Sequence, residues 1–203
     1  ALPILRDECR ARGVAFMSTP FDEPSLKTLL ELEVDIVKVA SFDLGNLPLI
    51  DKIGRSKIPT VMSIGGGKAH HIRSSVKQIE FHDTPLAILH CVSEYPCNFD
   101  RLGLNNIKKL KSEFPKHIVG LSDHFSGILS GPIAFTEGAR VFEKHVTMNR
   151  AWKGTDHSFA LEPEGFRKFV RDIKRVPGMM PEVDDSSLGN EVVFKKLQVL
   201  QGI

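Results

Sequence analysis

Short apolar runs alternate with stretches of helical periodicity along most of the chain. Six runs rich in valine, isoleucine, leucine or phenylalanine are predicted to be strands: Val14–Thr19, Asp35–Ser41, Thr60–Ile64, Leu86–Val92, Ile118–Ser122 and Val141–Thr147. Continuous apolar runs of this length are typical of strands that are buried on both faces, as in parallel sheets. The pattern therefore predicts an α/β fold.

Apolar positions at helical spacing lie before, between and after these runs. The predicted helices are Leu2–Arg12, Leu26–Leu32, Leu47–Ile53, Leu104–Phe114 and Pro163–Val176. Pro24-Ser25 and Asn46 stand where start signals are expected, before the second and third helices. Because strands and helices alternate along the chain, we expect right-handed crossover connections between parallel strands.

Every predicted strand ends in polar or ionisable residues. These ends are Ser18-Thr19, Lys38 to Ser41, Ser63, His90-Cys91, Ser122-Asp123-His124 and Glu143-Lys144-His145. An open doubly wound sheet concentrates its chemistry at one switch point. Polar residues after every strand instead fit a ring of strands whose C-terminal ends face one shared site, which predicts a (β/α)8 TIM barrel.

The number of strands falls short of that barrel. Six strands are visible in 203 residues, whereas the barrel has eight strands in roughly 250 residues. We expect an incomplete TIM barrel over residues 1–176, with one strand–helix–strand segment missing at the N-terminus. Residues 177–203 are expected to form a linker, rich in Pro, Gly, Asp and Ser, followed by the short amphipathic tail Val192–Leu200.

Composition and charge narrow the class of partner. Hydrophobic residues make up 41% of the chain and charged residues 26%, which argues against disorder. The net charge of +2 gives no reason to expect nucleic acid or an acidic membrane as partner. No apolar run approaches the length of a membrane span. Cys9, Cys91 and Cys97 have no paired zinc spacing, so we interpret them as reduced thiols of a cytoplasmic protein.

Hydroxyl groups at four strand ends indicate an anion site. Thr19, Ser41, Ser63 and Ser122 each end a different strand, and Lys38 lies three residues before Ser41. Hydroxyls and one lysine around a common axis suit a phosphate or carboxylate oxygen. Any one of these hydroxyls could instead cap the following helix, but the four together favour the anion site.

Two histidines at adjacent strand ends are candidate metal ligands. His124 and His145 could share one divalent ion and leave coordination positions open for substrate, although a lone histidine is usually structural. Asp43 lies at a loop mouth, and Asp156 lies in the loop after the last strand, where barrel enzymes commonly bind substrate. Both aspartates could equally be solvated loop residues or caps. Two further acidic residues near the strand ends are Asp123 and Glu143.

Six motifs, in order and at matching spacing, resemble those of the sialic acid synthase (N-acetylneuraminate synthase) family. They are Ser18-Thr19-Pro20-Phe21-Asp22, Val37-Lys38-Val39-Ala40-Ser41, Asn46-Leu47-Pro48-Leu49-Ile50, His90-Cys91-Val92-Ser93-Glu94-Tyr95-Pro96, Gly120-Leu121-Ser122-Asp123-His124 and Glu143-Lys144-His145-Val146-Thr147. Each motif alone is weak, but six in order are highly specific. The likeness extends from near the start of the chain to about Leu161.

The resemblance implies a metal-dependent condensation of phosphoenolpyruvate with an N-acyl sugar aldehyde, such as N-acetylmannosamine, to give a nonulosonic acid and phosphate. It implies that His124 and His145 bind Mn²⁺ or Mg²⁺, that Asp43 and Asp156 contact the sugar, and that the enzyme is a homodimer. The residues implied to hold phosphoenolpyruvate are Thr19, Lys38, Ser41, Ser63, Tyr95 and Ser122, with Ser93 nearby in the substrate site. Asp43 stands where the family often has glutamate, and Ser93 where some members have asparagine.

Family members also carry an N-terminal segment with a catalytic glutamate and a further lysine, and a C-terminal antifreeze-like domain that supplies an arginine to the partner subunit's site. We see neither in this sequence, so we expect the chain alone not to complete the reaction. Three alternatives stay open. They are another phosphoenolpyruvate-condensing aldolase-type barrel, a Schiff-base aldolase or lyase using Lys38 or Lys144, and a non-catalytic barrel fragment.

Overall fold

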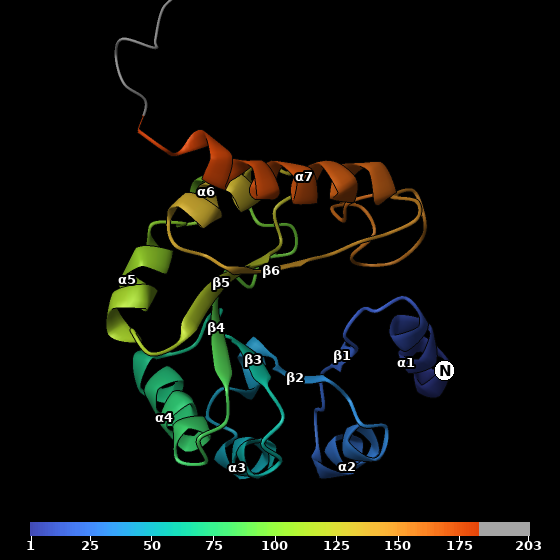
Figure 1. Ribbon diagram of the computed structural model, residues 1–203, viewed down its shortest axis with the longest axis vertical. Coiled ribbons are helices and arrows are strands. Elements are labelled where there is room, and N and C mark those ends of the chain that lie inside the picture. Colours follow the sequence, from blue (N-terminus) through green and yellow to red (C-terminus); the bar gives the residue numbers. More distant parts are fainter. Residues whose placement is uncertain (183–203) are drawn as a thin grey trace, which may run out of the picture.

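The computed structural model describes residues 1–182, which form one parallel sheet of six strands with helices around it (Figure 1). The strands are β1 (Met17–Ser18), β2 (Ile36–Val39), β3 (Thr60–Ser63), β4 (Leu86–Cys91), β5 (Ile118–Asp123) and β6 (Val141–Lys144). Each strand pairs in parallel with its neighbours in sequence, in the order β1-β2-β3-β4-β5-β6. All six predicted strands are therefore confirmed, with β1 shorter than expected.

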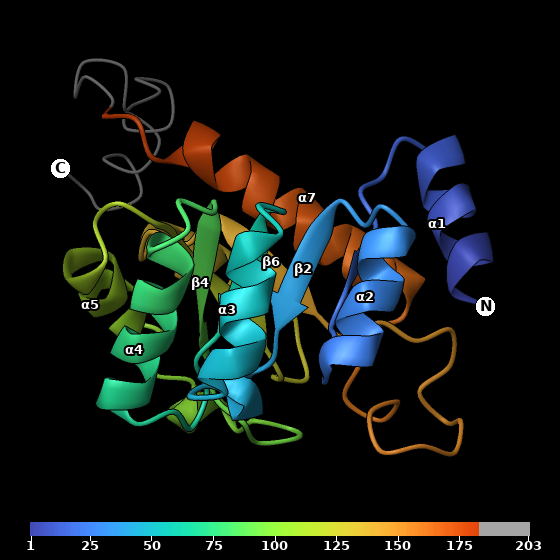
Figure 2. The same ribbon diagram turned by 90° about the horizontal axis from the view of Figure 1, so that it is seen from below.

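Seven α-helices are found in the described part of the chain. They are α1 (Leu2–Ala11), α2 (Glu23–Glu31), α3 (Leu47–Arg55), α4 (Ala69–Glu80), α5 (Asn106–Glu113), α6 (Ser130–Thr136) and α7 (Pro163–Met179), with two 3-10 turns, η1 (Ser41–Asp43) and η2 (Phe99–Arg101). Figure 2 shows α2, α3 and α4 side by side in one layer against the strands. The five predicted helices are confirmed, while α4 and α6 had no predicted bounds.

The sheet is curved, and the helices cover its outer face. In Figure 1 the strands follow an arc from β1 to β6, with α2 to α6 outside it and a gap between its two ends. Within residues 1–182, β1 and β6 are the two edges of the sheet. The structure is thus an incomplete (β/α)8 barrel, as predicted.

Two apolar clusters lie on opposite faces of the sheet. The larger one packs the outward side chains of the strands, such as Val37 and Val39, against helix residues such as Ile50 and Ile79. The smaller one, of Val61, Ala87 and Leu89, is separate from it. Since successive side chains of a strand point to opposite faces, the residue between Val37 and Val39 faces the inside of the barrel. That residue is Lys38.

The end of the barrel differs from the prediction. Helix α7 runs to Met179 with Pro177 inside it, so the linker predicted to begin at residue 177 was wrong for residues 177–179. Val176 is the last buried residue of the helix, and residues 177–179 continue it as an exposed last turn. The predicted tail Val192–Leu200 lies outside the described residues. No helix within residues 1–182 is long and apolar enough to cross a membrane.

Candidate functional site

A cavity of about 840 Å³ lies at the C-terminal ends of the strands. Nine of the predicted site residues line it: Thr19, Lys38, Ser41, Ser63, Ser93, Tyr95, Ser122, His124 and His145. They come from all six strands or the loops that follow them. The ring arrangement thus brings together residues that are far apart in sequence, and Asp43 and Asp156 are not among its lining residues.

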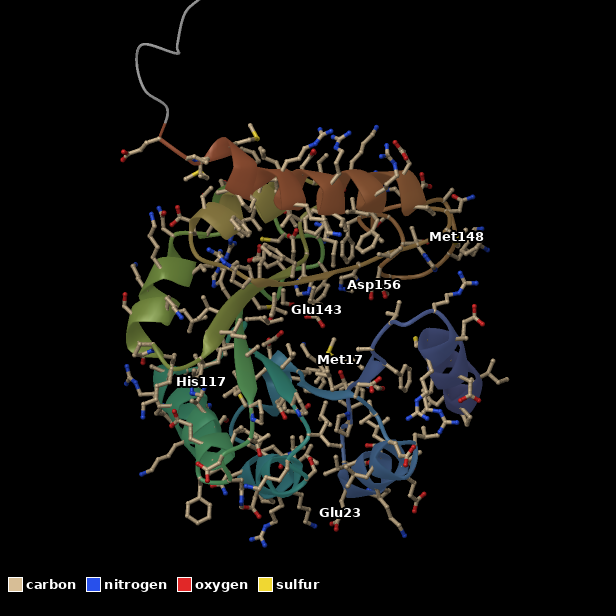
Figure 3. All side chains as sticks on the ribbon, in the orientation of Figure 1. Met17, Glu23, His117, Glu143, Met148 and Asp156 are labelled. Carbon is tan, nitrogen blue, oxygen red and sulfur yellow. The ribbon has the colours of Figure 1, made fainter. Side chains whose placement is uncertain are left out.

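Lys38 is the buried cation of this cavity. Its side chain is only 8% exposed, and its Nζ lies 3.2 Å from Oε2 of Glu143. The hydroxyl of Ser63 donates to the same carboxylate oxygen over 3.5 Å. Figure 3 shows Glu143 pointing into the space that the sheet encloses. A lysine and a carboxylate on β2 and β6 therefore meet across the inside of the barrel.

The strand-end hydroxyls are not helix caps. The residues at the N-cap positions of α2, α3, α4 and α6 are Asp22, Asn46, Lys68 and Leu129. Ser63 and Ser122 are buried at 2% and 5% exposure, and the Ser41 oxygen accepts a hydrogen bond from the Gly65 amide over 2.9 Å. The capping interpretation is excluded at these positions, and the hydroxyls stay available to a bound anion.

Gly65 makes this close packing possible. A Cβ atom at this position would lie 2.5 Å from the Ser93 hydroxyl oxygen and 2.7 Å from the Cys91 sulfur. Both distances are too short for any side chain, so glycine lets the loop after β3 approach the end of β4. This loop lines the cavity with its backbone.

The two histidines face each other across the ends of β5 and β6. Their ring centroids lie 5.3 Å apart, and the Tyr95 ring lies 3.9 Å from the His124 ring. The His124 Nδ1 lies 2.7 Å from the Val92 carbonyl oxygen. Because a carbonyl only accepts, Nδ1 must carry the proton, which leaves the lone pair of Nε2 for a ligand.

The electrostatics of the two rings differ. Burial lowers the pKa of His145, and the nearby His124 acts in the same direction, so its neutral form is favoured. For His124 burial also opposes the charge, but hydrogen bonding with Cys91 and with the Val92 carbonyl outweighs it and raises the pKa. The Cys91 sulfur lies 4.0 Å from Nδ1 of His124.

The histidine pair suits a divalent ion with open coordination positions. Within residues 1–182 no group of three or more histidine, cysteine, aspartate or glutamate side chains could hold a metal by itself. Two imidazoles on neighbouring strands leave positions for water and substrate, which a catalytic metal requires and a structural metal does not. The residues present fit such an ion, and its binding stays a prediction.

Asp43 and Asp156 occupy different surroundings. Asp43 is 8% exposed, and its Oδ2 has no hydrogen-bond partner among the described residues. Burial raises its pKa. Its neighbours Phe42 and Leu44 take the positions that line the cavity, so Asp43 does not reach it here. The Asp156 carboxylate lies 3.6 Å from His145 Nδ1 and points toward the enclosed space in Figure 3.

Several lining residues had no predicted role. Glu143 is the most important of them, and the alternation of side chains along a strand could have revealed it. Glu143 lies two residues before His145 and therefore faces the same side. The aromatic rings of Phe21 and Phe42 stack at 5.5 Å between centroids and line the same cavity. No sequence signal indicated that they would meet.

Synthases of legionaminic acid and of a neuraminic acid phosphate are among the relatives of this chain. It is 30% identical to N,N'-diacetyllegionaminic acid synthase of Legionella pneumophila over 96% of this chain and 56% of the relative. It is 34% identical to N-acetylneuraminate-9-phosphate synthase of Drosophila melanogaster over 96% of this chain and 54% of the relative. The chain thus spans about half the length of the curated relatives it matches.

A solved structure agrees with this likeness. The crystal structure of N-acetylneuraminic acid (sialic acid) synthetase from Leptospira borgpetersenii, in complex with citrate, matches with a TM-score of 0.85 and 30% identity, over 97% of this chain and 69% of that one. The six motifs, the half-barrel and the cavity at its strand ends all lie within residues 2–184, the segment that the NeuB family model matches. The chain therefore belongs to the NeuB family.

Proposed function

We propose that this cavity binds phosphoenolpyruvate and an N-acyl sugar aldehyde and joins them into a nonulosonic acid with release of phosphate. One observation carries the proposal. A buried lysine, buried hydroxyls and two facing histidines line a single cavity at the strand ends. The names of two relatives, a diacetyllegionaminic acid synthase and an N-acetylneuraminate-9-phosphate synthase, support this class of product.

Lys38 and the hydroxyls would hold phosphoenolpyruvate. Glu143 already places a carboxylate oxygen 3.2 Å from the ammonium group and within hydrogen-bond distance of Ser63. A phosphate or carboxylate oxygen of the substrate would exchange with Glu143 at these donors. Hydrogen bonds to charged groups contribute about 1.5–3 kcal/mol each, so Lys38 would supply much of the selectivity for an anion.

His124 and His145 would hold a divalent ion, Mn²⁺ or Mg²⁺, which would act as a Lewis acid toward the aldehyde oxygen of the sugar. In the condensation, the methylene carbon of phosphoenolpyruvate bonds to the aldehyde carbon. Water then adds to the resulting cation, and phosphate leaves from the tetrahedral intermediate. The chain's own residues would orient the two substrates and stabilise charge in a site of fixed dipoles.

The surroundings of the two lysines argue against a Schiff-base mechanism. A lysine that attacks a carbonyl must be neutral, whereas the Lys38 ammonium lies beside Glu143. Lys144 is 2% exposed and paired with Asp123 at 2.7 Å, and it does not line the cavity. Borohydride should therefore trap no substrate adduct on either lysine, and a trapped adduct would refute the proposed chemistry.

Saturation-transfer NMR would test the sugar site. With Mg²⁺ and phosphoenolpyruvate present, we expect transfer from the protein to N-acetylmannosamine but not to mannose, the matched sugar without the acylamino group. The transfer should disappear in His124→Ala and His145→Ala. Equal transfer to mannose would favour another phosphoenolpyruvate-condensing barrel, and no transfer to any sugar would favour a non-catalytic fragment.

Turnover by the 203-residue chain is a separate expectation. In the described structure the cavity wall is interrupted between β1 and β6, so water would reach the reacting atoms. We expect phosphate release well below the enzyme range of about 1–10³ per second, and release within that range would contradict this. The family resemblance also supports a homodimer, which sedimentation of the purified protein would test. The three free cysteines support a cytoplasmic protein.

A further inference from the structure

Directly behind the two histidines, on the outer face of the sheet, lies a buried ion pair. Asp123 precedes His124 and Lys144 precedes His145. The two are Cα partners in the β5–β6 ladder. Their side chains are 0% and 2% exposed, with Nζ of the lysine 2.7 Å from Oδ2 of the aspartate. No other ion pair within residues 1–182 is as deeply buried.

The pair and the histidines point to opposite faces. Successive side chains alternate along a strand, so a side chain that points outward at one position requires the next to point inward. Ser130 of α6 donates to Asp123 Oδ2, and the Lys144 ammonium lies 5.7 Å from the ring centroid of Phe169 in α7. These helix contacts fix the outward direction. The imidazoles of His124 and His145 then face the cavity.

Asp123, Lys144 and Ser130 form a network of hydrogen bonds. This network also holds the backbone on both sides of His124. Asp123 Oδ1 accepts from the Phe125 amide over 2.9 Å, and Lys144 Nζ donates to the Phe125 carbonyl oxygen. The residues before and after His124 are thereby tied to the residue before His145. Any shift of β5 against β6, or any rotation of the chain after β5, would break at least one of these contacts.

Stability alone does not account for such a pair. Replacing a buried ion pair by apolar residues of similar volume is often neutral or stabilising, because both charges must lose their hydration. What an apolar pair cannot reproduce is the directional set of bonds that joins one strand end to the next. The network therefore acts on geometry, and the geometry it controls is that of the two histidines.

We propose that Asp123 and Lys144 are positioning residues that set the distance and orientation of His124 and His145 for metal binding. This inference rests on the proposed function, because it assumes that the two imidazoles share a divalent ion. Neither residue lines the cavity, so neither would contact the metal ion or a bound substrate. Their role is comparable to that of other outer partners of metal ligands, whose loss usually costs 10–100-fold in metal affinity.

The decisive variant is Asp123→Leu/Lys144→Met, which removes both charges and their bonds and puts apolar side chains of similar volume in their place. We expect the urea midpoint of unfolding of this variant to equal that of the wild type. It should bind Mn²⁺ at least tenfold more weakly, as measured by electron paramagnetic resonance. Its affinity for phosphoenolpyruvate, measured without metal, should stay within about threefold of the wild-type value. The ¹⁵N NMR signals of His124 should also show loss of the single Nδ1–H tautomer.

Two further variants control for stability. Thr84→Val removes a buried hydrogen bond, from Thr84 Oγ1 to the Gly54 carbonyl oxygen over 2.6 Å, at the opposite end of the strands. It should lower the urea midpoint and leave Mn²⁺ affinity unchanged. Ser130→Ala removes one bond of the network and should weaken Mn²⁺ binding severalfold, which keeps the test available if the double variant does not fold.

The outcomes separate the two proposals. If the wild type binds Mn²⁺ and the double variant binds it within twofold, the positioning role is wrong and the proposed metal site stands. If Ser130→Ala and Thr84→Val weaken Mn²⁺ binding equally, the network serves stability alone, which also overturns the inference. If the wild type binds no Mn²⁺, the positioning role and the metal part of the proposed function both fail.

Discussion

The inner and outer faces of the sheet each carry a lysine–carboxylate pair near the same strand ends. On the inner face, Lys38 and Glu143 join β2 to β6 at 3.2 Å, and the glutamate side chain is 34% exposed. On the outer face, Lys144 and Asp123 join adjacent strands at 2.7 Å with 2% and 0% exposure. Two similar ion pairs therefore differ in what surrounds them.

The surroundings decide what each pair can do. The inner pair faces a cavity of about 840 Å³, so a ligand anion can replace Glu143 at the Lys38 ammonium. The outer pair is covered by α6 and α7 through contacts with Ser130 and Phe169, and no ligand reaches it. An ion pair open to a cavity suits binding, whereas a closed one suits fixed geometry.

Removing one partner of the Asp123–Lys144 pair, which α6 and α7 cover, should have the largest effect on the free energy of unfolding. Lys144→Met leaves the Asp123 carboxylate buried without its cation, which should lower the free energy of unfolding by about 3–5 kcal/mol. Lys38→Met leaves Glu143 with a third of its side chain exposed, and should cost less than about 1 kcal/mol. Urea unfolding of both variants measures this difference, and equal losses would show that the two faces do not differ as described.

Removing the carboxylate of the Lys38–Glu143 pair, which faces the cavity, should improve anion binding. Glu143→Gln takes away the negative charge that competes for Lys38, and the gain should be about 1 kcal/mol, or roughly fivefold in affinity for phosphoenolpyruvate without metal. Titration calorimetry would measure it, with Glu94→Gln as a matched control outside the cavity lining. Weaker binding in Glu143→Gln would mean that the carboxylate helps to hold the ligand.

A third carboxylate, Asp51, lies on the outer surface and should give a smaller, pH-dependent effect. It accepts hydrogen bonds from His82, Arg55 and Gln78. These interactions, with His82 the largest, lower its pKa to about 2. Because the folded pKa lies below the unfolded value, the stabilisation is present above about pH 4 and is lost as the pH falls through 2.

Asp51→Asn should therefore lower the unfolding midpoint at pH 7 by less than Lys144→Met does, and its difference from wild type should shrink below pH 4. Thermal unfolding between pH 2 and pH 7 would follow it. Glu31→Gln, at an exposed pair with Lys27 of 3.8 Å, serves as the control with little expected change. A constant difference across this range would show that the Asp51 charge is not responsible.

Local sequence predicted the strands and much of the site, because apolar runs and the polar residues after them lie next to each other in the chain. It did not delimit α4, which buries only Ser75, Val76 and Ile79 and has polar residues at most other positions. Nor did it delimit α6, a short helix interrupted in sequence by Gly131 and Pro132.

Contacts between residues that are distant in sequence could not be predicted from these local patterns. Glu143 could be assigned to the inner face by alternation, but its contact with Lys38 depends on the curvature of the whole sheet. Asp43 was expected at the cavity, and the turn η1 instead buries it and exposes Phe42. The pairing of Asp123 with Lys144 follows from the register of β5 and β6, which no local pattern specifies.

The central claim is that the cavity recognises phosphoenolpyruvate through Lys38. Calorimetric titration of phosphoenolpyruvate into wild type, Lys38→Met and Lys52→Met tests it most directly, since Lys52 is a partly exposed lysine on α3, outside the cavity lining. The account predicts that Lys38→Met binds about 10–100-fold more weakly, equivalent to 1.5–3 kcal/mol, and that Lys52→Met binds like wild type. Affinities within twofold of one another in all three proteins would contradict it.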